Sequence, residues 1–151
     1  MSNLLEVIEL TKFFDMGRKH RVHAVENVSL SIAEKEIVGL VGESGSGKST
    51  LGKTVLGLHD KTSGQVKFRG EVLPQKYQAK DFRRFATNMQ MIFQDPYSSL
   101  NPRMTIGEIV GEGLKLHQNH DPSIVRDKVA VWLEKVGLHA DHMSRYPHEF
   151  S

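Results

Sequence analysis

Apolar residues follow two different patterns along this chain, and the change between them divides it. In the first part, short apolar runs are separated by turns containing glycine or proline, which is typical of strands. The segments expected to form strands are 4–10, 25–32, 37–41, 65–69 and 89–93. After residue 104 the apolar residues recur every three or four positions, which predicts helices. The pattern therefore predicts an α/β front followed by an all-helical back.

Two helices are expected in the back part of the chain. Thr105 and Glu108 have the spacing of a capping box. Pro122 suits the first turn of the next helix, and Gly137 suits its end. A shorter helix is expected over 79–87. The residues predicted to form buried faces are Ile106, Ile109, Val110 and Leu114 in the first helix, and Val125, Val129, Trp132, Leu133 and Val136 in the second.

A glycine-rich segment joins the expected buried strand 37–41 to a helix that begins near Lys48. It reads GESGSGKST and fits G-x-x-x-x-G-K-[ST], the phosphate-binding loop. Glycines let the backbone curl so that successive N–H groups face phosphate oxygens, and the helix N-terminus adds partial positive charge. In this pattern Lys48 reaches the β- and γ-phosphates, and the Ser49 hydroxyl ligates Mg²⁺. The predicted nucleotide-binding residues are Gly42, Glu43, Ser44, Gly45, Ser46, Gly47, Lys48, Ser49 and Thr50.

Composition narrows the possible partners. The 151 residues carry 20 Lys and Arg against 18 Asp and Glu, a net charge of +2, so no large basic face indicates nucleic acid. There is no cysteine, which fits a reducing compartment. No leader is readable at the N-terminus, and no apolar run approaches the roughly 20 residues needed to cross a bilayer. We therefore expect a soluble, cytoplasmic protein without a membrane span.

Two polar features have ordinary structural explanations. The eight histidines include pairs spaced three apart, His117 with His120 and His139 with His142. Neither pair is accompanied by cysteine or by a convincing fourth ligand, so no zinc site is expected. The basic segment 13–21 is expected to be a solvated hairpin connection.

Several segments, read in order with the phosphate loop, resemble the ATP-binding subunits of ABC transporters. Residues 24–32 read AVENVSLSI ahead of the loop, and 91–96 read MIFQDP, which looks like the Q-loop of that family. SSLNPR at 98–103 and YPHEFS at 146–151 are similar to the oligopeptide and dipeptide importer branch, in which the second leads into the signature motif. The resemblance implies a P-loop NTPase core of the ABC ATPase kind, with an N-terminal antiparallel β region and the start of a helical subdomain.

The resemblance also implies roles for individual residues, with ATP and Mg²⁺ as cofactors. Phe14 matches the aromatic position at which the family stacks adenine, and packing within the hairpin is an even alternative. Gln94 matches the Q-loop glutamine, whose amide suits ligation of Mg²⁺ or orientation of the attacking water. Lys48 and Gln94 are thus the expected catalytic residues, and Ser49 and Gln94 the expected metal ligands. The residues after Gln94 are expected to face a transmembrane permease subunit.

The resemblance implies a partial, truncated nucleotide-binding domain. Residues 1–98 are expected to hold the β region and the P-loop core, and 99–151 the Q-loop exit and helical subdomain. Ser151 falls inside the signature motif, so the Walker B strand, the catalytic glutamate and the switch histidine are not expected in this chain. We expect strand edges and apolar faces to remain uncovered, and no strand that ends in an acidic residue to follow the Q-loop.

Two functions from different classes follow. The first is the ATP-hydrolysing subunit of a peptide importer, peripheral on the inner face of the membrane, acting with permease subunits and a second ATP-binding subunit. The alternative is a nucleotide-binding fragment without hydrolytic activity, because phosphoryl transfer needs several groups acting together. A kinase would call for an arginine-rich lid, which the region after Gln94 does not resemble. Peptide, nickel and glutathione importers share this branch, and oligopeptides are favoured only as the commonest case.

Overall fold

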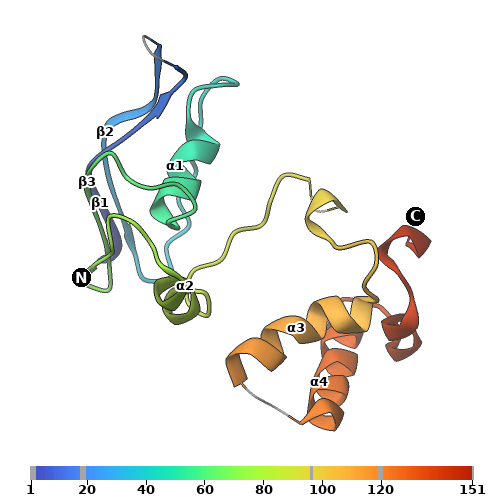
Figure 1. Cartoon of the computed structure of the whole chain (residues 1–151). Coiled ribbons are helices and arrows are strands. Elements are labelled where there is room, and N and C mark those ends of the chain that lie inside the picture. The colour runs from blue at the N-terminus through green and yellow to red at the C-terminus, as the bar shows by residue number, and fades with distance from the viewer. Residues whose placement is uncertain (1–2, 18–19, 96, 119–120, 151) are drawn as a thin grey trace. The chain divides into compact units, whose positions relative to one another are not determined.

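The computed structural model describes residues 3–17, 20–95, 97–118 and 121–150. The chain packs as two compact units, residues 1–91 and residues 92–151. Figure 1 colours the chain by residue number, from blue at the N-terminus to red at the C-terminus. Among the described residues, the first unit contains the sheet and two helices, and the second contains helices and no strand. The predicted division of a nucleotide-binding domain into a β region with P-loop core at 1–98 and a helical subdomain at 99–151 stays a prediction.

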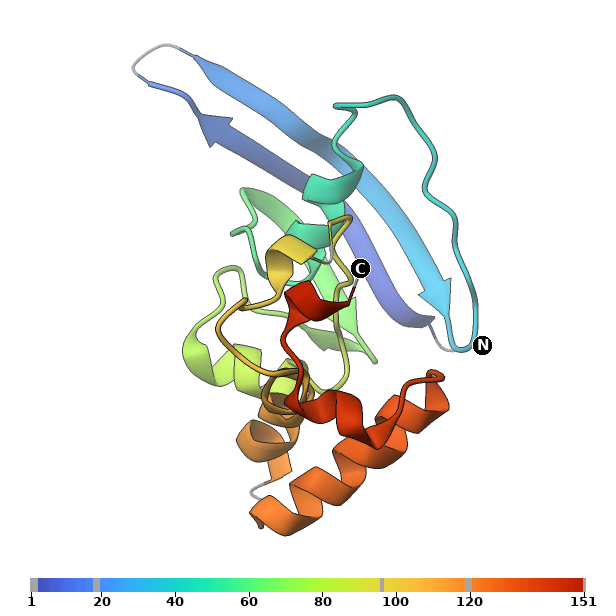
Figure 2. The ribbon, with the colours of Figure 1, turned by 90° about the vertical axis from the view of Figure 1, so that its right-hand side faces the viewer.

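A four-stranded antiparallel sheet, in the order β2-β1-β3-β4, forms the base of the first unit. Its strands are β1 (Asn3–Asp15), β2 (Arg21–Ala33), β3 (Ser63–Phe68) and β4 (Glu71–Val72). Pairing of β1 with β2 extends from Asn3 opposite Ala33 to Asp15 opposite Arg21, and Figure 2 shows the resulting long ribbon. The strands expected at 4–10 and 25–32 are confirmed, and they are longer than predicted because ladder hydrogen bonds do not require apolar side chains.

Helices α1 (Lys48–Val55) and α2 (Ala79–Phe85) complete the first unit. Leu51 places α1 in the same core as β1 and β2, and Phe85 does so for α2. The buried residues of this core are Val7, Leu10, Val25, Leu51, Val66, Leu73, Tyr77 and Phe85. Because Leu51 lies in the first turn of α1, the core fixes the end of the helix that follows the glycine-rich loop.

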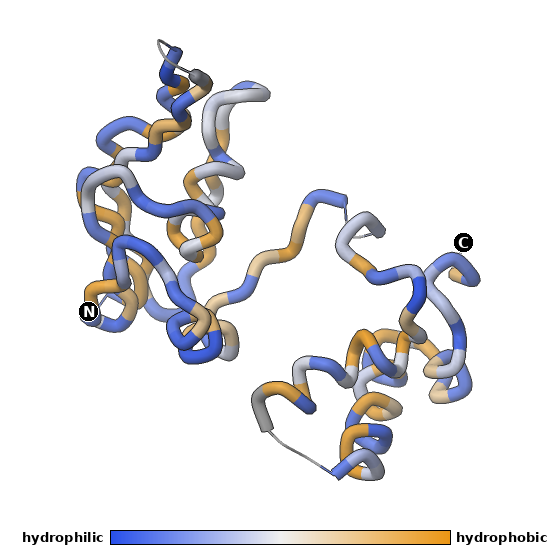
Figure 3. Tube along the Cα trace, in the orientation of Figure 1, coloured by the Kyte–Doolittle hydropathy of each residue, from blue (hydrophilic) through white to orange (hydrophobic). Residues whose placement is uncertain are grey.

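The strands predicted at 37–41 and 89–93 are wrong. Neither segment is assigned to a strand, and Ile37 and Ile92 are 98% and 92% exposed. Figure 3 shows the second of them as a hydrophobic stretch of extended chain after α2. A buried parallel strand needs hydrogen-bonded neighbours and covered faces, and within the described residues no strand pairs with either segment. Their exposure agrees with the expectation that apolar faces remain uncovered.

The second unit packs two helices, α3 (Ile106–Gln118) and α4 (Pro122–Lys135), against the short helix η2 (Ala140–Ser144). Two further short helices are η1 (Tyr97–Ser99) and η3 (Pro147–Glu149). The buried residues are Val125, Val129 and Leu133, packed against Ile106, Leu114, Leu138 and Met143. No helix of the described residues is long and apolar enough to traverse a bilayer.

Both helix starts predicted from the sequence are found. The Glu108 backbone N–H donates to Thr105 Oγ1 at 3.3 Å, and the Thr105 N–H donates to Glu108 Oε2 at 2.8 Å, which completes the capping box. These hydrogen bonds, first of all the one from the Thr105 backbone, hold the pKa of Glu108 below its usual value. Asp121 caps α4 by accepting from the Ser123 N–H at 2.9 Å.

The predicted buried face of α4 is too wide. Trp132 is 54% exposed and Val136, which caps the helix C-terminus, is also exposed. The buried stripe is limited to Val125, Val129 and Leu133, one residue per turn. Trp132 lies beside this stripe, where Lys135 Nζ is 4.3 Å from its ring centroid. Val110 of α3 is likewise exposed, contrary to prediction.

One further segment bears on the expectation that no strand ending in an acidic residue follows the Q-loop. The run 130–134 reads AVWLE, four apolar residues followed by glutamate, which has the letters of a strand that ends in an acidic residue. It lies inside α4 and therefore forms no strand. Glu134 consequently stands on a helix, near its C-terminal end.

Core packing in the first unit gives a stability prediction. Leu10 is fully buried, whereas Leu58 is 46% exposed beyond the end of α1. We expect Leu10→Ala to lower the free energy of unfolding by about 2–5 kcal/mol, because it removes buried apolar surface and leaves a cavity. Leu58→Ala makes the same chemical change and should cost clearly less. Urea denaturation of the two variants measures the difference, and equal losses would contradict the assigned core.

Candidate nucleotide-binding site

The segment before α1 makes a turn that depends on glycine. Gly45 and Gly47 have φ of +81° and +92°, in the left-handed region that favours glycine. The Ser46 N–H donates to the Glu43 carbonyl at 3.2 Å, which closes the turn. Gly47 is then the N-cap residue of α1. The chain therefore curls and enters the helix as the sequence pattern predicts.

Gly47 is required for a second reason, its close approach to β2. A Cβ placed on Gly47 would lie 2.0 Å from the carbonyl oxygen of Ala24. That is far inside van der Waals contact, and the obstacle is backbone rather than a flexible side chain. The close contact fixes the glycine-rich loop against β2, beside which the chain returns after β2 ends (Figure 2).

The N-terminus of α1 has the features of an anion site. No acidic residue lies in its first turn, and Gly47 has no side chain with which to cap it. The first N–H groups of a helix have no partner within the helix and carry partial positive charge. Ser49 is exposed in this first turn and Thr50 is half-buried. The exposed Ser49 hydroxyl is an oxygen ligand of the kind that Mg²⁺ binds together with waters and phosphates.

Lys48 folds back over the loop. Its Nζ donates to the carbonyl oxygens of Gly42 at 2.7 Å and Glu43 at 2.6 Å, and to Ser46 Oγ at 3.2 Å. A Cβ on Gly42 would lie 2.8 Å from the same Ser46 Oγ, so the loop closes tightly around the lysine head group. The ammonium group therefore lies at the mouth of the curled backbone, where the motif expects phosphate charge.

A cavity of about 430 Å³ adjoins the loop. It is lined from β2 by His23, Ala24, Val25, Glu26 and Val28, and from the following segment by Leu40, Val41, Gly42, Ser46, Gly47, Lys48 and Leu51. Its size is within the usual range for small-molecule sites. The residues of β2 in this lining were not identified from the sequence.

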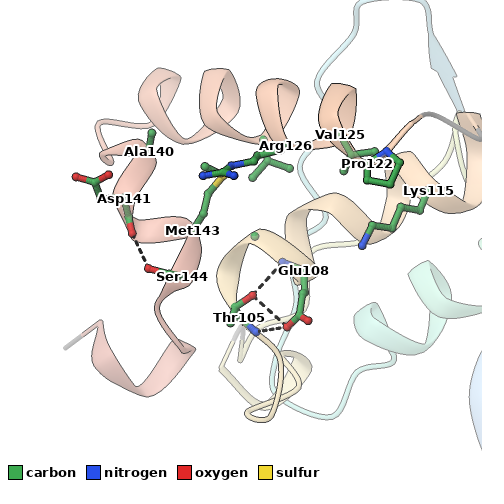
Figure 4. Close-up of a pocket in the computed structure, with 12 residues that line it drawn as sticks. Thr105, Glu108, Lys115, Pro122, Val125, Arg126, Ala140, Asp141, Met143 and Ser144 are labelled. Carbon is green, nitrogen blue, oxygen red and sulfur yellow. Dashed lines mark hydrogen bonds between the residues drawn. The ribbon is translucent and has the colours of Figure 1, made fainter.

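A larger cavity, of about 670 Å³, lies in the second unit between α3, α4 and η2 (Figure 4). Its floor is apolar, with Val125 and Val129, and charged residues of both signs stand around it, including Glu108 and Arg126. It contains none of the glycine-rich loop. The smaller cavity is therefore the candidate for a nucleotide, because its lining includes the lysine and two of the loop glycines.

Phe14, the predicted adenine platform, is half-buried on β1. The His59 ring meets it edge-on, with centroids 5.2 Å apart at 87°, and Lys12 Nζ is 4.8 Å from its centroid. These contacts support the alternative role of Phe14, in which its ring packs within the first unit. Phe14 is not among the residues that line the loop cavity. Adenine stacking on Phe14 stays a prediction.

Gln94 is exposed and belongs to the second unit. Its predicted roles in catalysis and metal binding therefore stay predictions. Pro96 of the predicted Q-loop lies outside the described residues, as does His120. Within the described residues no group of three or more His, Cys, Asp or Glu side chains is arranged to hold a metal ion.

Comparison with known proteins decides the family. Residues 25–151 match the family described as ABC transporter, with the glycine-rich loop near the start of the match. This chain belongs to the ABC transporter family. The match confirms the family resemblance seen in the sequence.

Relatives within the ABC transporter family are closely similar over almost the whole chain. It is 50% identical over 149 residues to YkfD of Bacillus subtilis, covering 98% of the chain and 45% of the relative. It is 46% identical to the oligopeptide transport ATP-binding protein OppF of Streptococcus mutans, covering 98% and 48%. The chain therefore spans about half the length of the curated relatives it matches.

Solved ABC cassettes share the fold. The ATP-binding cassette MJ0796, in a dimeric post-hydrolysis state with ADP and Pi, matches with a TM-score of 0.85 and 25% identity, over 97% of this chain and 63% of that one. CbiO1 from Clostridium perfringens matches with a TM-score of 0.76 and 22% identity, over 100% and 57%. These likenesses confirm the predicted fold class of a P-loop ABC core.

Gly45 and Gly47, the two glycines of the glycine-rich loop with positive φ, form a matched pair for a stability test. Alanine at Gly45 meets no atom within 4 Å, so Gly45→Ala should cost only the left-handed backbone penalty of about 1–2 kcal/mol. Gly47→Ala has the same penalty and also a clash with the Ala24 carbonyl, so its loss should be larger. Chemical denaturation compares the two. Equal losses would show that the approach of the loop to β2 is not a constraint.

His59 gives a prediction about pH. Burial lowers the pKa of His59 from its usual 6.5, and the positive charges of Lys12 and Lys53 lower it further. Well above pH 6.5 the imidazole is neutral in both the folded and the unfolded state. As pH falls below 6.5 the unfolded chain takes up the proton first, so stability should fall. His59→Gln should weaken this acid sensitivity between pH 8 and pH 5.5; an unchanged pH dependence of unfolding would contradict it.

Proposed function

We propose that this chain is part of the ATP-binding subunit of an ABC importer for peptides, and that residues 42–50 bind the phosphates of MgATP. The observation that carries the proposal is the glycine-dependent loop that leads into an uncapped helix N-terminus with the Lys48 ammonium at its mouth. The names of the relatives support peptides as the class of transported substrate. One of them is the dipeptide transport protein DppF of Lactococcus lactis, 44% identical over 98% of this chain and 48% of DppF.

Phosphate binding would use groups that are already positioned. The N–H groups at the start of α1 would donate to phosphate oxygens, and Lys48 would exchange the carbonyls of Gly42 and Glu43 for phosphate. The exchange is favourable because a lysine–phosphate hydrogen bond joins two charges and is stronger than one to a neutral carbonyl. Ser49 would hold the Mg²⁺, with Gln94 as a second ligand. When bound, the ion neutralises charge between the β- and γ-phosphates.

Hydrolysis is part of the proposal for the whole protein, with Gln94 orienting the attacking water. The alternative is binding without hydrolysis by this chain. After Gln94 the described residues contain no strand that ends in an acidic residue, since the run 130–134 is helical. Phosphoryl transfer requires charge compensation from several groups at once, so binding without turnover is consistent with the residues described.

The proposed partners are those of an importer. Transmembrane permease subunits would contact the Q-loop region after Gln94, and a second ATP-binding subunit, identical or homologous, would complete the nucleotide sites. MJ0796, a cassette of the same fold, forms a dimer. The proposed location is the cytoplasm, peripheral on the inner face of the membrane. The proposed domain division places the β region and P-loop core at 1–98 and the helical subdomain at 99–151.

Removal of the Lys48 ammonium tests the proposed phosphate site. Hydrogen bonds to charged groups contribute about 1.5–3 kcal/mol, so Lys48→Ala should weaken MgATP binding roughly tenfold to a hundredfold. Lys53→Ala removes the same charge from the last turn of the same helix and should change affinity little. Isothermal titration calorimetry on the purified chain measures both. Equal affinities in Lys48→Ala and the unsubstituted chain would refute the phosphate site.

A further inference from the structure

Helix α4 has a second apolar face beside the stripe that it buries. Ile124, Val131 and Trp132 are 45%, 50% and 54% exposed. We define the α4 outer face as Ile124, Lys128, Val131, Trp132 and Lys135, which at 3.6 residues per turn lie within an arc of about 100° around the helix axis. None of the five belongs to the apolar cluster of the second unit. The helix can therefore keep its buried stripe in the core while the outer face contacts something else.

The charges of α4 are separated by sign. The outer face contains two lysines, whereas the two acidic residues of the helix, Asp127 and Glu134, lie outside its arc. These two carboxylates lie beyond the edge marked by Val131, about 80–120° around the helix from the lysines. Arg126 projects on another side, where it lines the cavity between α3, α4 and η2 (Figure 4). The outer face thus combines exposed apolar side chains with positive charge only.

Trp132 and Lys135 are in direct contact on this face. Lys135 Nζ is 4.3 Å from the centroid of the Trp132 ring. A lysine stem covers apolar surface while its ammonium group stays in water. Tryptophan combines a broad apolar ring with one N–H donor, which suits it to the boundary between hydrocarbon and water. The pair therefore presents an apolar ring and a positive charge at the same level of the helix.

We infer that the α4 outer face binds an anionic lipid surface, with the helix lying along the plane of the headgroups. Apolar side chains on one face of a helix enter the boundary between headgroups and acyl chains, and lysines are attracted to anionic headgroups. An arc that holds lysines and no acidic residue complements the charge of that surface. The inference goes beyond the proposed function, because the outer face shares no residue with the cavity beside the glycine-rich loop. It gives the proposed peripheral location a direct contact with lipid.

Trp132 is the only tryptophan of the chain, so its fluorescence reports on the outer face directly. The purified chain is mixed with vesicles of equal parts phosphatidylglycerol and phosphatidylcholine, or with vesicles of phosphatidylcholine alone. The Trp132 emission maximum should move to shorter wavelength with the anionic vesicles and stay unchanged with the neutral ones. High salt should reduce the shift, because it screens the attraction between lysines and headgroups.

Lys135→Gln and Arg126→Gln form a matched pair, because each removes one positive charge from an exposed position of α4. A basic residue close to an anionic surface raises partitioning about fivefold. Lys135→Gln should therefore weaken co-sedimentation with the anionic vesicles about fivefold, and Arg126→Gln clearly less. Val131→Asp should also weaken it, because it places a negative charge on the apolar part of the face. All three positions are exposed, so folding should survive, which circular dichroism checks.

Three results would overturn the inference: equal binding to neutral and anionic vesicles, equal losses in Lys135→Gln and Arg126→Gln, or no vesicle binding, which would leave the face to a protein partner. MgATP affinity, measured on the same samples, separates this inference from the proposed function. Lys135→Gln should bind MgATP as the unsubstituted chain does. If the unsubstituted chain binds MgATP but not anionic vesicles, only the present inference fails; if it binds vesicles but not MgATP, only the proposed function fails.

Discussion

The approach of the Gly47 backbone to the Ala24 carbonyl is the constraint on which the candidate site depends. It brings the entry of α1 against β2 closely enough that no side chain fits between them. The core residue Leu51, one turn further on, holds the same helix from the apolar side. Between these two anchors the helix N-terminus, the curled loop and Lys48 have fixed places relative to β2. The cavity and its lining follow from that arrangement.

Features determined by neighbouring residues were predictable from the sequence. The phosphate loop is specified by nine consecutive positions, and the capping box by Thr105 and Glu108, so both could be recognised from spacing. The two segments 37–41 and 89–93 show where prediction from neighbouring residues fails. Their composition suits a strand, but a strand exists only where other segments supply hydrogen bonds, and composition does not reveal which segments those are. Helix periodicity likewise did not reveal how narrow the covered stripe of α4 is, which leaves Trp132 exposed.

In the candidate site, too, some residues could be identified from the sequence and others could not. Lys48 and Ser49 are identified by the motif itself, whereas His23 lies on a strand well before the loop and lines the cavity beside it. Nothing in the sequence around His23 marks it as a residue of this cavity. Phe14 was chosen through family resemblance, and in this fold its ring is engaged by His59 and Lys12. Gln94 was identified in the same way, and it lies on the second unit.

The bonds that Lys48 makes with its own loop have a consequence for selectivity among anions. Three acceptors of the loop already surround the ammonium group, so a ligand gains only what exceeds those contacts. A chloride ion presents a single charge and one contact centre, and it would replace several short bonds with one. A polyphosphate presents many oxygens and several charges to the same cradle. If the loop binds phosphate as proposed, these contacts would therefore make it discriminate against the small monovalent ions that are abundant in a cell, before any organic part of the ligand is recognised.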